Sequence, residues 1–145
     1  MTCIAYKDGV LAADRMMSIR GFAVPATKIH CIVTPEGREI VGVSGHTRDA
    51  VTFLEWLKTG SIDPKPTITE EDGFSAYVVK GGKLWHYESN MVCVEMDVPF
   101  WAWGCGGDLA MGAMAHGASA KEAVEIACRF DINCGLGVDV LETDK

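Results

Sequence analysis

The chain of 145 residues has no surplus of basic side chains: its 13 lysines and arginines are outnumbered by 20 aspartates and glutamates, for a formal net charge of −7. A nucleic-acid partner needs a basic face, so this balance argues against DNA or RNA binding. No apolar run approaches the roughly 20 residues that a membrane helix requires. The first residues also lack the basic-then-apolar order of a signal peptide. We therefore expect no nucleic-acid partner, no membrane partner and a cytoplasmic location.

The spacing Cys-x-x-Cys is missing as well, although the chain has six cysteines. Zinc sites and thioredoxin-type redox motifs rest on that spacing. Most of the cysteines stand among apolar neighbours, and we interpret them as reduced thiols that pack as small hydrophobic residues. The four histidines have no spacing suited to a metal, and residues 104–107 lack the Gly-Lys-Ser/Thr ending of a phosphate loop. We predict neither a metal site nor a cofactor.

What the chain does contain fits a soluble globular protein, with 48% hydrophobic and 23% charged residues. Its length suits a single domain over residues 1–145. Apolar alternation between turn signals predicts strands at 3–6, 10–14, 28–33, 39–43, 74–79, 84–88, 92–96, 100–103 and 138–141. Apolar residues at helical spacing, with capping signals, predict helices at 47–58, 108–116 and 119–130.

Several hairpins with about three helices indicate an α+β fold. Two antiparallel sheets packed face to face, with helices on the outer faces, would bury these apolar surfaces. The predicted architecture is thus a four-layer αββα sandwich. Residues 60–72 contain two prolines and are predicted to form a surface loop rather than a linker between domains.

Thr2 offers a chemistry of its own if the peptide bond before it is cleaved. Removal of Met1 would give Thr2 both a hydroxyl and a free α-amine. An α-amine has a pKa of about 7.7–8.0, so near neutral pH it can accept a proton. A threonine that carries its own base can act as a nucleophile without a histidine.

Five segments, in order along the chain, resemble the proteasome β-subunit and HslV peptidase family of N-terminal nucleophile (Ntn) hydrolases. They are Thr2-Cys3-Ile4-Ala5 with Gly9–Asp14, Thr27-Lys28-Ile29, Val43–Ala50, Trp103–Asp108, and Asp131-Ile132-Asn133-Cys134-Gly135. The resemblance implies the sandwich of the Ntn-hydrolase type and an active site at the amino terminus.

The resemblance implies roles for individual residues. Thr2 would attack a peptide carbonyl, with its own amine as general base. Lys28 would lie beside it and favour the developing alkoxide, and Asp14 would pair with Lys28. Gly45 matches the glycine whose N–H forms the oxyanion hole. Taken alone, Asp14 and Lys28 also fit an ordinary surface ion pair, and Gly45 fits a simple strand-to-helix turn.

Asp131 is retained from the family pattern, but Cys105 and Cys134 stand where the family usually has serines. A thiol is a weaker hydrogen-bond partner than a hydroxyl, so proton transfer around the amine would be less well supported. Alternatively, both thiols are packing residues, and a backbone amide or a water molecule takes their place.

The resulting hypothesis is a threonine-type endopeptidase that cleaves unfolded polypeptides through an acyl-enzyme on Thr2, within a homo-oligomeric ring. An ATPase unfoldase is a possible further partner without support in the sequence. Two alternatives stay open. One is a non-catalytic proteasome-like assembly subunit that retains Met1, and the other is an Ntn amidohydrolase acting on small amides.

Overall fold

The structure is a computed structural model, and it describes residues 2–62, 64–69 and 71–143. The chain forms two compact units. The first joins the residues up to Ile29 with those from Val98 onward, and the second is His30–Asp97. Each unit has its own hydrophobic core. Two predictions depend on how the two units are arranged: the single domain over residues 1–145 and the four-layer sandwich. Both stay predictions.

The first unit is built on a four-stranded antiparallel sheet in the order β10-β1-β2-β11. Its strands are β1 (Ile4–Lys7), β2 (Val10–Asp14), β10 (Phe100–Trp103) and β11 (Val138–Glu142). The turn between β1 and β2 has positive φ at both Asp8 (53°) and Gly9 (77°). Positive φ at both central residues is typical of the tight turn that matches strand twist, which explains the Asp-Gly pair.

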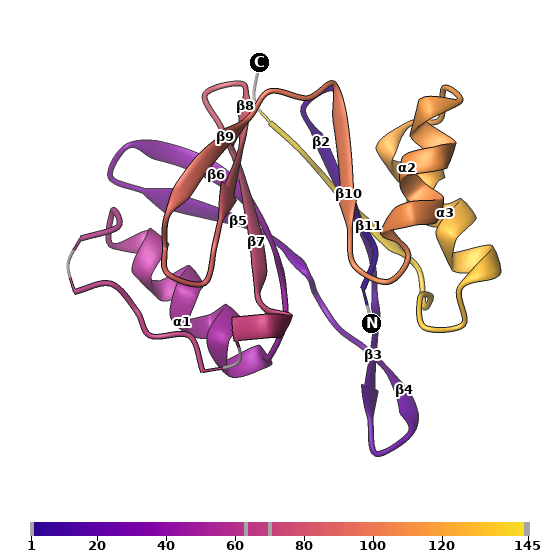
Figure 1. The fold of residues 1–145 in the computed structure, drawn as a ribbon, viewed down its shortest axis with the longest axis horizontal. Helices are drawn as coiled ribbons and strands as arrows, with labels where there is room; N and C mark the ends of the chain where they lie inside the picture. Colours follow the sequence, from indigo (N-terminus) through magenta and orange to yellow (C-terminus); the bar gives the residue numbers. More distant parts are fainter. Residues whose placement is uncertain (1, 63, 70, 144–145) are drawn as a thin grey trace. The chain divides into compact units, whose positions relative to one another are not determined.

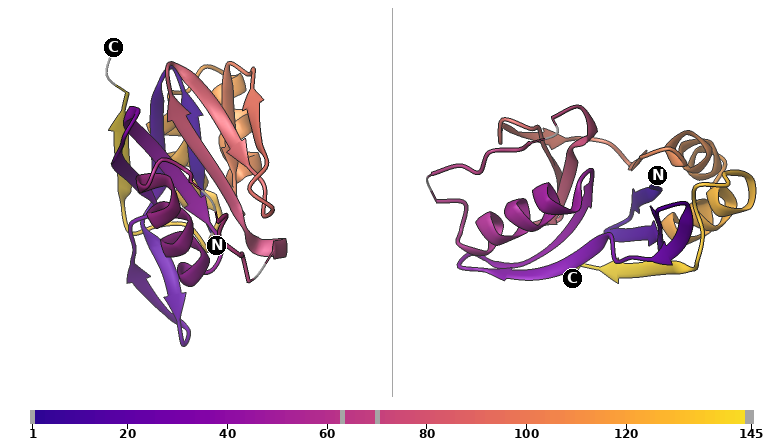
Figure 2. Two further views of the ribbon diagram at one scale, coloured as in Figure 1. Left: turned by 90° about the vertical axis from the view of Figure 1, so that its left-hand side faces the viewer. Right: turned by 90° about the horizontal axis from the view of Figure 1, so that it is seen from below.

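Two helices, α2 (Gly107–Ala115) and α3 (Ala120–Phe130), lie side by side and cover one face of this sheet (Figures 1 and 2). The core between them is made largely of small side chains: Cys3, Ala5, Ala12, Ala102, Ala110, Met114, Ala120, Ala123, Val124, Ala127 and Cys134. Small side chains let the helices approach the strands closely. The predicted capping box opens α3, since Ser119 and Glu122 each accept a hydrogen bond from the other's backbone N–H.

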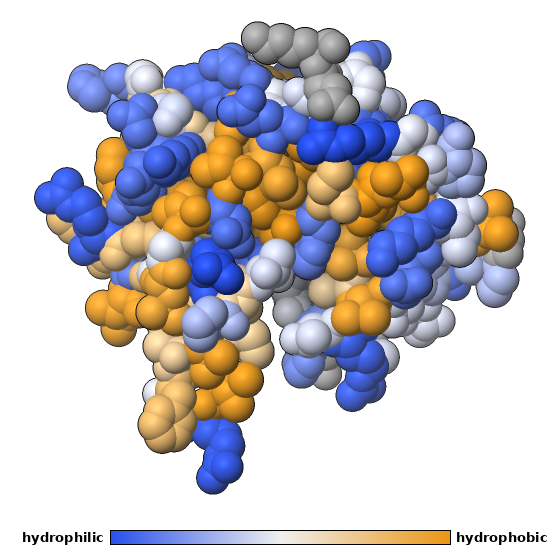
Figure 3. Space-filling view, turned by 180° about the vertical axis from the view of Figure 1, so that it is seen from behind, coloured by the Kyte–Doolittle hydropathy of each residue, from blue (hydrophilic) through white to orange (hydrophobic). Residues whose placement is uncertain are grey.

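The sequence did not predict a second hairpin in this unit, formed by β3 (Met16–Ile19) and β4 (Phe22–Pro25). Its turn again has two positive φ angles, at Arg20 (55°) and Gly21 (83°). The hairpin projects from the sheet (Figure 1), and its surface is largely hydrophobic up to a hydrophilic tip (Figure 3).

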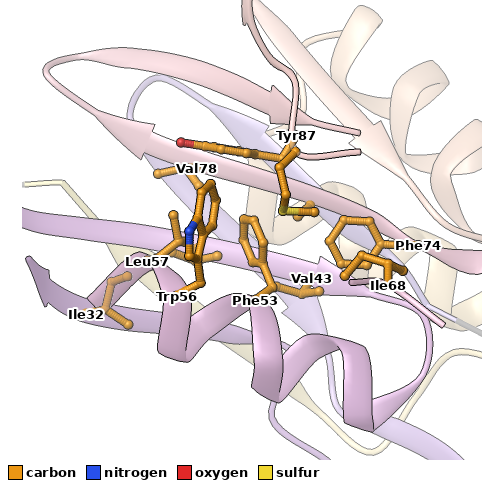
Figure 4. Packing of buried hydrophobic residues seen from close by; sticks show 12 residues of the cluster. Ile32, Val43, Phe53, Trp56, Leu57, Ile68, Phe74, Val78 and Tyr87 are labelled. Atoms are coloured by element: carbon orange, nitrogen blue, oxygen red, sulfur yellow. The ribbon is translucent and has the colours of Figure 1, made fainter. Parts of the chain in front are cut away.

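The second unit is a five-stranded sheet in the order β5-β6-β7-β8-β9, with one helix and one 3₁₀ turn. Its elements are β5 (Ile29–Thr34), β6 (Gly37–Ser44), α1 (Thr47–Lys58), η1 (Glu71–Gly73), β7 (Ser75–Lys80), β8 (Lys83–Tyr87) and β9 (Cys93–Met96). The buried face of α1 brings Phe53 and Trp56 against Phe74 and Tyr87 (Figure 4). These four rings make an aromatic core.

The α+β class is therefore confirmed, with antiparallel sheets and three α-helices in the described part of the chain. The predicted strands and helices agree with the observed ones to within about two residues. The predicted loop ends in the 3₁₀ turn η1. Across the described ranges, none of the helices has the length and apolar character needed to cross a membrane.

Candidate active site

Thr2 lies just before β1, and its backbone is held against the loop that joins β10 to α2. Its nitrogen lies 3.1 Å from the Cys105 Sγ, and its carbonyl accepts a hydrogen bond from the Gly106 N–H at 3.1 Å. Gly104 has φ of +93°, and a Cβ on it would overlap the Thr2 carbonyl. Only glycine fits that close approach. The nitrogen that cleavage would turn into an α-amine thus faces the Cys105 thiol.

Asp14, the last residue of β2, is fully buried and accepts four hydrogen bonds. Its Oδ1 accepts from the Lys28 Nζ at 2.7 Å and from the Cys3 N–H at 3.0 Å. Its Oδ2 accepts from the N–H groups of Met16 and Gly135, both at 3.2 Å. A buried charge needs such complete pairing, because desolvation would otherwise neutralise it.

Lys28 is also buried, with 8% of its surface exposed, so the Asp14–Lys28 contact is not a surface ion pair. The same carboxylate oxygen that binds Lys28 binds the amide of the residue next to Thr2. The ion pair is therefore fixed directly to Cys3, the residue between the candidate nucleophile and β1.

Cys105, Asp131 and Cys134 form a third group. The two Sγ atoms are 3.7 Å apart. Asp131 follows α3, and its Oδ1 accepts from the Asn133 N–H at 2.8 Å. Burial raises the pKa of the Cys134 thiol, and the negative charge of Asp14 raises it further. Burial likewise raises the pKa of Cys3 to about 12.

Gly45 belongs to the second unit, where it follows β6 and precedes α1. It has φ of +124°, and a Cβ there would lie 2.8 Å from the Gly73 carbonyl oxygen. The turn therefore requires glycine on its own account. The role of the Gly45 N–H as an oxyanion-hole donor in the reaction of Thr2 stays a prediction.

The first unit thus brings together six of the seven residues that the sequence singled out: Thr2, Asp14, Lys28, Cys105, Asp131 and Cys134. Sequence reasoning missed the structural part played by Gly104, Gly106 and the Gly135 amide. The glycines flanking Cys105 were the available signal, because a cysteine between glycines marks a tight backbone approach. Nothing local to Gly135 indicates a bond to Asp14.

Comparisons with protein-family models and with curated proteins found no match. Solved structures do match over nearly the whole chain. BPH from Thiobacillus denitrificans, in complex with epoxomicin, is 19% identical, with 99% of each chain covered and a TM-score of 0.67. Eukaryotic HslV from Trypanosoma brucei is 19% identical, over 98% of this chain and 99% of that one, with a TM-score of 0.69. A Gly-1 mutant of Anbu from Hyphomicrobium sp. strain MC1 is 11% identical, over 99% and 82%, with a TM-score of 0.71.

The fold is that of the proteasome-like Ntn hydrolases. The resemblance seen in the sequence is confirmed at this level, since HslV and Anbu share the fold along nearly the full length of the chain.

Proposed function

We propose that the chain is a threonine-type endopeptidase whose nucleophile is Thr2, freed by cleavage of the Met1–Thr2 bond. Met1 lies outside the described residues. One observation carries the proposal: the Thr2 nitrogen faces the Cys105 thiol, and the buried Asp14–Lys28 pair is hydrogen-bonded to the amide of the next residue, Cys3. An ordinary surface ion pair would instead be exposed to water.

In the proposed reaction, the Thr2 Oγ attacks the carbonyl carbon of a peptide bond, and its proton passes to the α-amine. The Lys28 ammonium favours the alkoxide, and the Gly45 N–H would stabilise the oxyanion. The C–N bond breaks, the leaving amine takes the proton, and an ester on Thr2 remains. Water then attacks this ester, releases the carboxylic acid and restores the hydroxyl.

The test combines mass and activity. Intact mass of freshly expressed protein should show loss of Met1, and a panel of fluorogenic peptides should be hydrolysed. Thr2→Ala should lower hydrolysis by at least about a thousandfold, since it removes the attacking atom. Thr2→Ser, which keeps a hydroxyl and an amine, should retain activity. A cleaved wild-type chain that hydrolyses no peptide and does not react with a peptide epoxyketone, which needs both groups, would refute the proposal.

Unfolded polypeptide is the proposed substrate, and a homo-oligomeric ring the proposed assembly. Large apolar side chains of the first unit stand exposed, including Phe22 (72%), Phe130 (66%) and Ile132 (89%). A subunit interface would bury such groups. All six cysteines are free thiols, which supports the proposed cytoplasmic location. Light scattering of the purified chain should give the mass of an oligomer.

The second candidate is a non-catalytic assembly subunit that retains Met1. The two thiols at positions 105 and 134 favour it, since each is a weaker hydrogen-bond partner than a serine hydroxyl. Intact mass separates the two functions, because only the peptidase requires a cleaved bond before Thr2. Small amides, tested beside the peptides, would reveal an Ntn amidohydrolase.

A further inference from the structure

Folding assembles a cluster of metal-binding side chains that sequence spacing does not show. Cys105 lies in the loop before α2, and Asp131 and Cys134 lie just after α3. The two thiol sulfurs and a carboxylate oxygen all stand within 4.8 Å of one another. Cys134 is separated from Cys105 by 29 positions along the chain, so no short cysteine motif could reveal the pair.

The distance between the sulfurs fits a metal ion better than a disulfide. Zn–S bonds are about 2.3 Å long and zinc is tetrahedral, so two thiolates on one zinc ion stand about 3.8 Å apart. The observed Sγ–Sγ distance is 3.7 Å. A disulfide would instead require the two atoms to close to about 2.05 Å. The pair already stands at the spacing of one edge of a zinc tetrahedron.

The other donors suit the same ion. Zinc accepts sulfur, nitrogen and carboxylate ligands together, and the thiols of Cys105 and Cys134 would release their protons to solvent as the ion binds. Asp131 supplies the carboxylate, and the N–H of Asn133 orients it through Oδ1, as an outer hydrogen bond does for many metal-binding carboxylates. Cys105 is exposed, so an ion can enter from solvent.

The Thr2 nitrogen lies beside one of these three donors and could supply a fourth ligand. This nitrogen is 3.1 Å from the Cys105 Sγ, and a nitrogen and a thiolate on one zinc ion stand about 3.5 Å apart. An amide nitrogen is no ligand for zinc, but the neutral α-amine of a cleaved chain is one. The lone pair of this α-amine is the one that would accept the proton of the Thr2 hydroxyl in the proposed reaction.

We propose that Cys105, Asp131 and Cys134 form a zinc site whose fourth ligand, after cleavage, is the α-amine of Thr2. Bound zinc holds the lone pair of that amine and so inhibits the hydrolase reversibly. The zinc site stands on the geometry of the cluster, whereas the inhibition rests on the proposed peptidase function.

Cobalt(II) tests the site without reference to activity. Titration of the reduced, full-length protein with Co²⁺ should produce a thiolate-to-cobalt charge-transfer band, which Zn²⁺ should abolish by displacing the cobalt. Cys105→Ser and Cys134→Ser should each lower the affinity by at least about tenfold and weaken the band. Asp131→Asn should weaken binding while the band remains. The controls are Cys31→Ser and Cys93→Ser, exposed cysteines on β5 and β9, which should bind as the wild type does.

The absence of a charge-transfer band from the wild type, or its persistence in a Cys105→Ser/Cys134→Ser double variant, would overturn the zinc site. X-ray absorption of the zinc-loaded wild type provides a check that needs no variant, and it should show two sulfur neighbours at about 2.3 Å. Finding only oxygen and nitrogen neighbours would equally overturn the site.

Inhibition is tested on the cleaved protein with a fluorogenic peptide. Zn²⁺ should lower the hydrolysis rate by at least about tenfold, EDTA should restore it, and Cys134→Ser should reduce the ratio between zinc-free and zinc-loaded rates. A cleaved chain that binds cobalt but hydrolyses no peptide after EDTA has removed all metal leaves the metal site standing and refutes the peptidase. A chain that binds zinc and is still fully active refutes the inhibition alone.

Discussion

The two units of this chain have cores of opposite kinds. The first packs alanines and cysteines between a sheet and two helices, and its buried carboxylate, Asp14, accepts four hydrogen bonds. The second packs large rings, with Phe53 in edge-on contact with both Phe74 and Tyr87. Small side chains let backbones approach and place atoms closely, whereas aromatic rings bury more area per residue. Six of the seven candidate site residues lie in the first unit, and Gly45 lies in the second.

The largest expected effect comes from the buried charge of the first unit. Asp14→Asn should destabilise the protein by about 3–5 kcal/mol, because one buried ion loses the carboxylate that faces it. The amide NH₂ would also point at N–H donors where Asp14 now accepts hydrogen bonds. Peptide hydrolysis should fall at least about a hundredfold, since Lys28 loses the group that positions it.

Urea unfolding and peptide hydrolysis measure the two effects of Asp14→Asn. The matched control is Glu95→Gln, which breaks the exposed pair with Lys83 in the second unit. It should cost less than about 1 kcal/mol. An Asp14→Asn protein as stable as this control would show that the buried pair does not hold the first unit together.

An equally large loss of stability, without direct damage to the chemistry, is expected in the aromatic core. Phe53 is fully buried, and its ring centroid lies 5.2 Å from that of Tyr87. Phe53→Ala should cost about 3–5 kcal/mol through lost burial and the cavity left behind. Val51→Ala, on the exposed side of α1, is the control and should change stability by under about 0.5 kcal/mol.

The comparison between units predicts that cobalt binding survives Phe53→Ala at temperatures where the variant stays folded, since every proposed ligand lies in the first unit. Loss of cobalt binding in a folded Phe53→Ala protein would contradict that separation.

Much of the fold of both units could be predicted from the sequence, because the signals involve residues that are close together in the chain. The Asp8-Gly9 turn, the Ser119–Glu122 capping box and the apolar stripe of α1 are each set by residues close together in the chain. The β3–β4 hairpin was missed because its strands are exposed and lack a buried face to give them alternation.

The candidate site could be predicted as a set of residues but not as an arrangement. Asp14, Lys28 and Thr2 were recognisable from motif segments in order along the chain. The Cys105–Cys134 contact joins a loop to the end of a helix 29 positions later, and the Gly135 amide reaches Asp14 across 121 positions. Contacts of that range depend on packing between elements, and no local pattern encodes them.

A smaller effect should follow from crowding the alanine core. Ala127 on α3 is fully buried, and its Cβ would lie 3.1 Å from a Cβ added at Gly106. Ala127→Val should cost about 1–3 kcal/mol, because extra methyl groups have no space there. It should also weaken cobalt binding by displacing Cys105 and Cys134. Ala115→Val, on an exposed position of α2, is the control and should leave both measurements near wild type.

The smallest expected effect is a pH dependence of the unfolding free energy that comes from histidines of the second unit. Burial lowers the pKa of His30 in the second unit, and the positive charge of Lys58 lowers it further. Below the usual histidine value of about 6.5, the unfolded chain takes up a proton that the folded chain refuses. Unfolding free energy should therefore be fully present above that pH and decline as pH falls toward the lowered pKa.

Urea unfolding at a series of pH values between about 7 and 5 measures the decline expected from His30. His30→Gln should flatten the slope. Burial also lowers the pKa of His86, on β8 of the same unit, so part of the slope should survive His30→Gln and disappear in the double variant. A slope that persists unchanged without both histidines would contradict the assignment of this pH sensitivity to His30 and His86.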